Sequence, residues 1–204
     1  MNEKLVVVFA GPNGSGKSTV VDNALALNQC PKTFICPDNY VAAEDKDDAE
    51  AIKAAMRKAE AVRHSELANG NSFSFETVLS MPDKLEFIRY AQWQGYTVHV
   101  VYVTTEDPEI NIERVKTRVA QGGHDVPEDK LRARYERSMN LMFDVIREAD
   151  RVDFYDNSGN TPRFVAMKND IAICTCDDVP AWLETYVLSK ARERGIMVTS
   201  LVPV

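Results

Sequence analysis

The first 155 residues alternate between short apolar runs and longer segments in which apolar residues recur with helical spacing. Short runs rich in β-branched and aromatic residues predict buried strands, and the segments between them predict amphipathic helices. We expect strands at residues 4–10, 33–36, 72–79, 97–104 and 151–155. We expect helices at residues 17–27, 45–69, 81–94, 107–121 and 127–149. This alternation predicts an α/β fold in which a parallel sheet is covered by helices on both faces.

The remainder of the chain breaks the alternation. Two apolar runs at 164–168 and 171–175, joined by a turn at Asn169-Asp170, predict a C-terminal hairpin. Residues 179–194 predict a closing helix. The 204 residues contain no internal repeat, and their number suits one well-buried domain. We therefore expect residues 1–204 to form a single domain.

Eight residues after the first predicted strand fit the phosphate-binding pattern G-x-x-x-x-G-K-[ST] in full. They are Gly11, Pro12, Asn13, Gly14, Ser15, Gly16, Lys17 and Ser18, and Thr19 follows them as a further candidate residue of the loop. The glycines let the backbone approach an anion closely, and N–H groups at the start of the helix then point toward it. Lys17 can reach the β- and γ-phosphates of a nucleotide, and Ser18 can bind Mg²⁺. The pattern and its strand–helix context predict a P-loop NTPase fold with ATP and Mg²⁺ as cofactors.

Polar residues or glycine follow the end of each predicted parallel strand. These positions are Gly11, Asp38, Glu76, Thr105 and Asp156. Because the carboxyl ends of parallel strands meet at one rim, where ligands bind, we expect these residues to converge. Asp38 could then accept a proton from an attacking hydroxyl or bind Mg²⁺. The alternative is that Asp38 is an ordinary turn residue after Pro37.

The strand at 72–79 has one apolar and one polar face. Phe73 and Phe75 share the first face, and Ser74 and Glu76 lie on the second. A polar face on a central strand predicts a cleft, in which Glu76 and Thr77 hold substrate hydroxyls. The alternative is an edge strand whose polar face contacts solvent.

The region 107–149 predicts a helical lid. Two basic helices flank Gly122-Gly123, and their arginines are Arg114, Arg118, Arg132, Arg134 and Arg137. Closure of such a lid could bring guanidinium groups onto the transferred phosphoryl group and exclude water. The alternative is a solvated helix pair in which these arginines form ion pairs with glutamates.

The turn at 156–160 follows the fifth parallel strand and lies on the same predicted rim. Asn157 in this turn is a candidate contact for the adenine of ATP, and an ordinary Asn/Gly turn is the alternative. The strand at 97–104 ends in Thr104-Thr105 and lacks the aspartate that binds Mg²⁺ in motor ATPases and GTPases. Mg²⁺ is therefore expected to rely on Ser18, the nucleotide phosphates, water and Asp38.

Composition narrows the class of function. The sequence has 24 Lys and Arg against 31 Asp and Glu, a net charge of −7, which disfavours non-specific binding to nucleic acid. No apolar run approaches the ~20 residues of a membrane span, and no signal-peptide pattern follows Met1. We expect a cytoplasmic protein without membrane contact. The four cysteines have no C-x-x-C spacing and are expected to be core thiols, and the three scattered histidines predict no metal site.

Several of these segments occur together in one known family. The phosphate loop is followed by P-D at 37–38, F-S-F-E-T at 73–77, R-V-K-T-R-V-A-Q-G-G-H-D-V-P at 114–127, R-Y-E-R-S at 134–138 and Y-D-N-S at 155–158. From about residue 4 to 165 the chain resembles the zeta-toxin-like P-loop kinases. The resemblance implies ATP- and Mg²⁺-dependent phosphorylation of a sugar hydroxyl, such as that of UDP-N-acetylglucosamine. It also implies an antitoxin protein as a candidate partner.

The resemblance assigns a role to each matching residue. It places Lys17 on the ATP phosphates and makes Asp38 the general base. It places Glu76 and Thr77 on the substrate side. It assigns lid arginines to the transition state, for which we choose Arg118 and Arg134, with Arg132 as the near alternative.

Three functions remain open at the level of the sequence. The leading hypothesis is an ATP-dependent kinase that transfers the γ-phosphoryl group to a hydroxyl of a small molecule. The second is a regulatory NTPase without a small-molecule acceptor. The third is a nucleic-acid end kinase, which the net charge and the lack of an aromatic and basic stripe disfavour.

Overall fold

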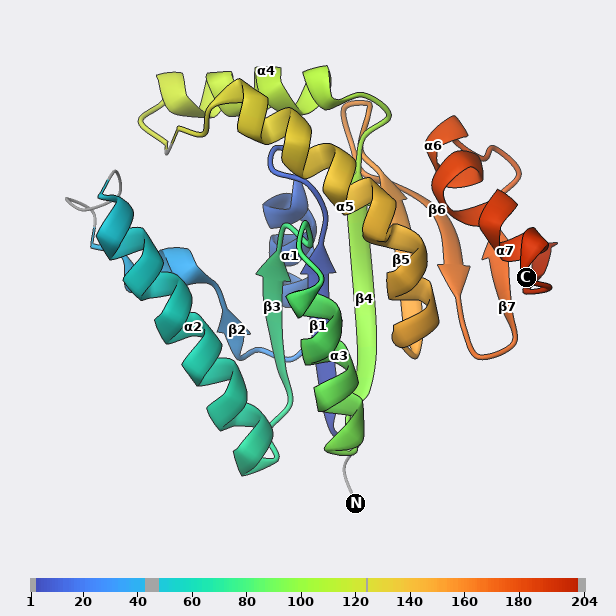
Figure 1. The fold of residues 1–204 in the computed structure, drawn as a ribbon, viewed down its shortest axis with the longest axis horizontal. Coiled ribbons are helices and arrows are strands. Elements are labelled where there is room, and N and C mark those ends of the chain that lie inside the picture. The colour runs from blue at the N-terminus through green and yellow to red at the C-terminus, as the bar shows by residue number, and fades with distance from the viewer. Residues whose placement is uncertain (1–2, 43–47, 124, 202–204) are drawn as a thin grey trace.

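The computed structural model describes residues 3–42, 48–123 and 125–201. Within these ranges eight strands form one sheet, shown in Figure 1, in the order β2-β3-β1-β4-β5-β6-β7-β8. Their bounds are β1 Leu5–Ala10, β2 Phe34–Ile35, β3 Phe73–Thr77, β4 Thr97–Thr104, β5 Arg151–Asp156, β6 Arg163–Lys168, β7 Ala172–Thr175 and β8 Met197–Ser200.

Helices cover both faces of this sheet. The α-helices are α1 Lys17–Ala26, α2 Ala49–Asn69, α3 Asp83–Trp93, α4 Pro108–Ala120, α5 Glu128–Glu148, α6 Ala181–Leu183 and α7 Ser189–Glu193. A 3₁₀ turn, η1 (Pro37–Tyr40), follows β2, and a π-helical segment, η3 (Glu184–Leu188), joins α6 to α7. In Figure 1, α2, α3 and α5 lie in front of the sheet, α1 lies behind it, and α4 lies past the carboxyl ends of the central strands.

The strands β2, β3, β1, β4 and β5 are mutually parallel. The predicted α/β fold with a parallel sheet and helices on both faces is therefore confirmed. The predicted hairpin is also present, because β6 runs antiparallel to β5 and β7 antiparallel to β6. The sequence analysis missed β8, which pairs parallel to β7 beyond the closing helix. Residues 45–47, at the start of the predicted second helix, lie outside the described residues.

Alternation of side chains along each strand gives the sheet two apolar faces. On the front face, buried side chains such as Val8, Phe75 and Tyr102 belong to the large cluster that α3 and α5 complete. On the back face, Val7 and Phe9 pack with residues of α1. The sheet therefore fixes the carboxyl ends of its strands rigidly, and these ends carry the phosphate loop and the turns beside it.

Strand β3 lies between β2 and β1, so the alternative of an edge strand is wrong. Its polar face is buried at Ser74, whose Oγ donates a hydrogen bond to the Pro31 carbonyl oxygen over 3.0 Å. Only Glu76 and Thr77, at the end of the strand, reach the rim half-buried. A cleft along this face could therefore involve only the last residues of β3, and its presence stays a prediction.

Helices α4 and α5 add a small apolar cluster of their own, formed by Ile112, Val115, Val126 and Leu131. Further along α5, Met139 and its neighbours belong to the main front cluster. Helix α5 is thus anchored in the main core at its C-terminal part, while its first turn packs only against α4 and the preceding loop.

The expectation of core thiols holds for two of the four cysteines. Cys30 and Cys36 are buried, whereas Cys174 and Cys176 are only half-buried, because the side of the β6–β7 hairpin that carries them is incompletely covered. Across the described ranges, the helices are all too short or too polar to cross a lipid bilayer.

Candidate functional site

The phosphate loop connects β1 to α1 at the carboxyl edge of the sheet. Gly14 and Gly16 have positive φ angles of 75° and 87°, which side chains other than glycine rarely adopt. A Cβ on Gly16 would lie 2.1 Å from Asn157 Nδ2, and one on Gly14 would lie 2.4 Å from the Asn111 carbonyl oxygen. The glycines therefore allow the loop to curve, and they also allow it to pack closely against neighbouring residues.

Two asparagines hold the backbone of this loop. Asn157 Nδ2 donates a hydrogen bond to the Ser15 carbonyl oxygen over 2.8 Å, and Asn111 Nδ2 donates one to the Asn13 carbonyl oxygen over 2.9 Å. Both asparagines are buried, and Asn111 Oδ1 accepts a hydrogen bond from Thr105 Oγ1. Satisfied buried amides of this kind rigidify the loop before any ligand binds. The side chain of Asn157, predicted near adenine, is directed at the loop instead, and its contact with a nucleotide stays a prediction.

Lys17 is buried and points back at its own loop. Its Nζ donates hydrogen bonds to the carbonyl oxygens of Gly11 and Pro12 over 2.8 and 2.9 Å. Burial lowers the pKa of this amine, the carboxylate of Glu76 raises it, and Arg118 lowers it further. Glu76 and Arg118 therefore both act electrostatically on Lys17. Phosphate oxygens are stronger acceptors for an ammonium group than carbonyls, so the amine is poised to move onto a nucleotide.

Three side chains gather where β2 and β3 end. Cys36 Sγ lies 3.8 Å from Glu76 Oε1. Burial, followed by the charge of Glu76, raises the pKa of the Cys36 thiol to about 12, and the charge of Asp38 also raises it. The thiol therefore stays protonated at neutral pH and can donate its hydrogen to Glu76. Asp38 itself is exposed in η1, on the open side of the rim.

Thr77, the last residue of β3, supports the loop through its backbone. Its carbonyl oxygen accepts a hydrogen bond from the Gly11 N–H over 3.2 Å. Its hydroxyl accepts a hydrogen bond from the N–H of Leu79 over 3.1 Å, where the chain turns with a φ of 53°. These hydrogen bonds do not bear on the predicted contact of Thr77 with a substrate hydroxyl, which stays a prediction.

The structure brings two of the predicted lid arginines to the phosphate loop. One guanidinium nitrogen of Arg134 donates a hydrogen bond to Asn13 Oδ1 over 3.3 Å. Arg118, exposed on α4, is close enough to Lys17 to lower its pKa. The two arginines thus approach the loop from different helices.

The other arginines of this region have protein partners elsewhere. Arg132 binds Glu109 over 2.8 and 2.9 Å and Glu128 over 3.3 Å, so it belongs to the surface that α4 and α5 share. Arg114 donates to the Gly159 carbonyl oxygen over 2.9 Å, and its other terminal nitrogen is buried without a partner among the residues that the structure describes. The sequence analysis offered the alternative that these arginines form ion pairs with glutamates in solvent. That alternative is correct for Arg132, whereas Arg134 contacts the phosphate loop. His124 lies outside the described residues.

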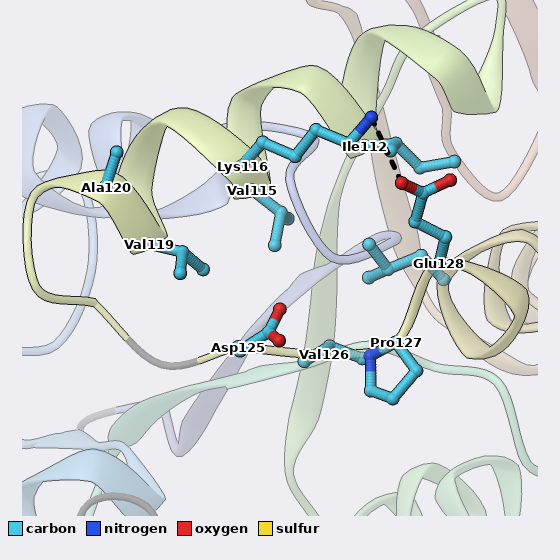
Figure 2. Close-up of a pocket in the computed structure, with 10 residues that line it drawn as sticks. Ile112, Val115, Lys116, Val119, Ala120, Asp125, Val126, Pro127 and Glu128 are labelled. Carbon is cyan, nitrogen blue, oxygen red and sulfur yellow. Dashed lines mark ion pairs between the residues drawn. The ribbon is translucent and has the colours of Figure 1, made fainter.

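A cavity of about 450 Å³ lies between α4 and the segment that leads into α5. Figure 2 shows the residues that line it. Its apolar lining consists of Ile112, Val115, Val119, Ala120, Val126, Pro127 and Leu131. An ion pair of 3.0 Å between Lys116 and Glu128 connects the two helices at its side.

Ser18 and Asp38 were predicted to hold Mg²⁺, and both are exposed at the rim. Among the residues that the structure describes, no group of three His, Cys, Asp or Glu side chains could hold a metal ion. Binding of Mg²⁺ through Ser18 and Asp38, beside nucleotide phosphates and water, stays a prediction.

A family model described as zeta toxin matches residues 2–166, which is most of the chain. The chain belongs to the zeta toxin family. The match includes the phosphate loop, β1 to β5 and the helices α4 and α5. Strands β7 and β8 and the closing helices lie beyond it. An uncharacterized protein of Haemophilus influenzae is 30% identical over 131 residues, which cover 63% of this chain and 91% of that protein.

Two solved structures have a fold similar to that of this chain. One comes from the PezAT chromosomal toxin–antitoxin system of Streptococcus pneumoniae, with a TM-score of 0.58 and 15% identity, over 79% of this chain and 71% of that chain. The other is the AvrRxo1-ORF1:-ORF2 complex, with a TM-score of 0.70 and 13% identity, over 93% of this chain and 65% of that chain. The family and the fold together support a nucleotide-dependent, kinase-like function.

The sequence did not reveal three features of the phosphate loop and its surroundings. Asn111, between two isoleucines of α4, occupies a buried position that a hydrophobic pattern assigns to the core. Cys36 was considered only as a core thiol, although it adjoins Pro37-Asp38 in the sequence. Arg114, which is half-buried and has one buried nitrogen without a partner among the described residues, was grouped with the lid arginines. A polar residue inside an apolar helix face was the available signal for Asn111.

Proposed function

We propose that the protein is an ATP-dependent phosphotransferase that moves the γ-phosphoryl group to a hydroxyl of a small molecule. A sugar or a nucleotide sugar such as UDP-N-acetylglucosamine is the acceptor class that the family suggests. The single observation that carries the proposal is that the end of β3 is joined to a phosphate loop that holds a buried lysine. Lys17 Nζ lies 2.8 Å from the Gly11 carbonyl oxygen, and the Gly11 N–H donates a hydrogen bond to the carbonyl oxygen of Thr77, the residue after Glu76, over 3.2 Å. This arrangement supports a phosphate site and a carboxylate-lined acceptor site side by side, as transfer between two bound molecules requires.

In the proposed reaction, the acceptor oxygen forms a bond to the γ-phosphorus while the bond from that phosphorus to the β–γ bridging oxygen breaks. ADP leaves, and the acceptor proton passes to the Asp38 carboxylate. Lys17 leaves the carbonyls of its own loop and holds the β- and γ-phosphates. Ser18 would hold Mg²⁺, which would supply charge neutralisation for the phosphates. Glu76 and Thr77 orient the acceptor.

Turnover of ATP with a panel of acceptors tests this function. The protein is incubated with Mg-ATP alone and with sugars, nucleotide sugars or nucleosides, and both ADP and phosphorylated product are measured. We expect at least one class to raise ADP formation well above the acceptor-free rate, with one phosphorylated product per ADP. ADP formation that no acceptor changes would identify a regulatory NTPase, and phosphorylation of polynucleotide ends alone would identify an end kinase.

Arg134→Ala is expected to lower kcat by about 10²-fold, because one preorganised donor to the transferred group is lost. The affinity for ATP should change much less, since the backbone of the loop holds the phosphates independently. Arg132→Ala on the same helix is the matched control, because Arg132 is engaged with Glu109 and Glu128. Exposed ion pairs of that kind contribute only ~0–1 kcal/mol, so the control should retain activity. Equal kcat values for the Arg134→Ala and Arg132→Ala variants would show that Arg134 has no specific part in the reaction.

A further inference from the structure

A closed ring of hydrogen bonds joins the phosphate loop to the end of β4 and to helices α4 and α5. Asn111 of α4 donates to the Asn13 carbonyl oxygen over 2.9 Å, and Thr105, directly after β4, donates from Oγ1 to Asn111 Oδ1. The Tyr135 hydroxyl of α5 donates to the Thr105 carbonyl oxygen over 2.6 Å. Arg134, the residue before Tyr135, donates to Asn13 Oδ1 over 3.3 Å. The ring therefore begins and ends at one residue of the loop.

The residues that link β4 to the two helices are buried. Thr105 is fully buried, Asn111 is 2% exposed and Tyr135 is 6% exposed. Inside a protein each polar group of such a network depends on the next, because a donor or acceptor that loses its partner finds no water in its place. The buried part of the ring therefore holds one geometry, and the half-buried Asn13 and Arg134 complete it at the loop.

Tyr135 lies where α5 enters the main core. It is the first residue of α5 that belongs to the front cluster, whereas Leu131, one turn earlier, belongs to the small cluster with α4. The hydroxyl of Tyr135 adds a polar link to the end of β4 at the same point. Because Arg134 directly precedes this anchored residue, the position of its backbone is set by Tyr135.

Asn13 offers two different oxygens to the ring. Its backbone carbonyl accepts a hydrogen bond from Asn111, and its side-chain Oδ1 accepts one from Arg134. It lies in the same loop as Lys17, whose Nζ binds the carbonyl oxygens that precede Asn13. An amide oxygen is a weaker acceptor for a guanidinium group than a phosphate oxygen. Asn13 therefore keeps Arg134 beside the loop and competes little with a nucleotide.

We propose that Tyr135 is a positioning residue that acts through Arg134, because its hydrogen bond to the end of β4 directs the guanidinium group to the phosphate loop before ATP binds. This inference rests on the proposed function for the part that Arg134 takes in the reaction. An arginine that is already held loses less side-chain freedom when the phosphate arrives, so more of its interaction acts on the transferred group. Asn13 holds the guanidinium group until the γ-phosphate replaces its amide oxygen as the acceptor.

The position of Arg134 is tested without catalysis. The side-chain amide signals of Asn13 are followed by NMR in the ¹⁵N-labelled protein without nucleotide, and they are identified by their absence in Asn13→Asp. Arg134→Ala removes the donor to Asn13 Oδ1 and gives the reference shift. We expect Tyr135→Phe to move the Asn13 signals toward those of Arg134→Ala. Asn13 signals that stay at their wild-type positions in Tyr135→Phe would overturn the proposal, whatever the activity of the protein.

The effect on transfer is tested with a double-mutant cycle. Tyr135→Phe removes one hydroxyl from a buried side chain, and we expect it to lower kcat by about 10-fold with little change in the KM for ATP. In the Arg134→Ala background the same substitution should have almost no further effect, because the group that it positions is already absent. An equal loss of kcat in both backgrounds would show that Tyr135 only supports the fold, which overturns the proposal.

Tyr96→Phe is the matched control. Tyr96 is 3% exposed, and its hydroxyl donates to the carbonyl oxygens of Glu66 and Leu67 over 3.2 Å each, away from α4 and α5. We expect both tyrosine variants to lower the melting temperature by a similar amount and only Tyr135→Phe to lose kcat. A loss of kcat of the same size in Tyr96→Phe would assign the effect to general loss of stability and overturn the proposal.

A second variant keeps the test independent of the folding of the first. If Tyr135→Phe does not fold, Asn13→Ala opens the ring at the loop, and its loss of kcat should likewise nearly vanish in the Arg134→Ala background. An equal loss in both backgrounds again overturns the proposal. If wild type transfers phosphate to no acceptor while Tyr135→Phe still shifts the Asn13 signals, the proposed function is rejected and the positioning of Arg134 by Tyr135 is retained.

Discussion

Lys17→Met is expected to lower kcat by about 10³-fold while the protein remains folded. The substitution keeps the apolar stem of a buried side chain and removes the one ammonium group that lies inside the phosphate loop. The two asparagines that hold the loop do not depend on Lys17, so the loop should keep its shape. Steady-state turnover, with circular dichroism and thermal melting as measures of folding, checks this result.

Lys32→Met, at an exposed lysine before β2, is the matched control and should keep full activity. The pH dependence gives an independent measurement. Because burial lowers the pKa of Lys17 in the free protein, its charge is lost at a lower pH than that of an ordinary lysine. The affinity for ATP should therefore decline as pH rises toward the alkaline range, and Lys17→Met should lack this decline. A folded Lys17→Met variant with wild-type turnover would refute the assignment of the loop.

Asp38→Asn is expected to reduce kcat by about 10²–10⁴-fold, the usual contribution of a general base. The amide keeps the size of the carboxylate but cannot take the acceptor proton. Asp38 is exposed in η1 and outside the phosphate loop, so ATP binding should be nearly unchanged. The variant is assayed with the best acceptor of the panel, and ATP binding is measured by calorimetry.

The control for charge is Asp22→Asn, which removes an exposed carboxylate of α1 away from the rim. It should retain both ATP affinity and turnover. If Asp38→Asn and Asp22→Asn transfer phosphate equally fast, Asp38 is a turn residue after Pro37 and another group accepts the proton.

The phosphate loop was predictable because all the residues that define it are consecutive in the sequence. Gly14, Gly16 and Lys17 act through local backbone geometry, and the strand and helix around them have clear periodicity. The parallel sheet followed from the same periodicity. Element boundaries agreed within a few residues, since strands and helices end where apolar spacing ends.

The support of the loop was not predictable, because it depends on contacts between distant residues. Asn111 meets Asn13 across 98 positions of sequence, and Asn157 meets Ser15 across 142. Arg63 is similar: its sequence neighbours suggest an exposed helix face, and only the placement of α2 over Phe75 buries it. Strand β8 was missed because its four residues follow a helix and are mostly exposed, so they show little apolar signal.

Strand β8 also determines where the sheet remains open. It lies five positions from β1 in the sheet order, and no described strand pairs with its outer side. With ~4.8 Å between neighbouring strands, that side is about 24 Å from the strand that leads into the phosphate loop. A protein that extended the sheet there would leave the rim accessible to ATP. Inhibition by occlusion therefore requires contact with the loop, η1 or the α4–α5 pair, so assembly at the edge and control of the reaction are spatially separate.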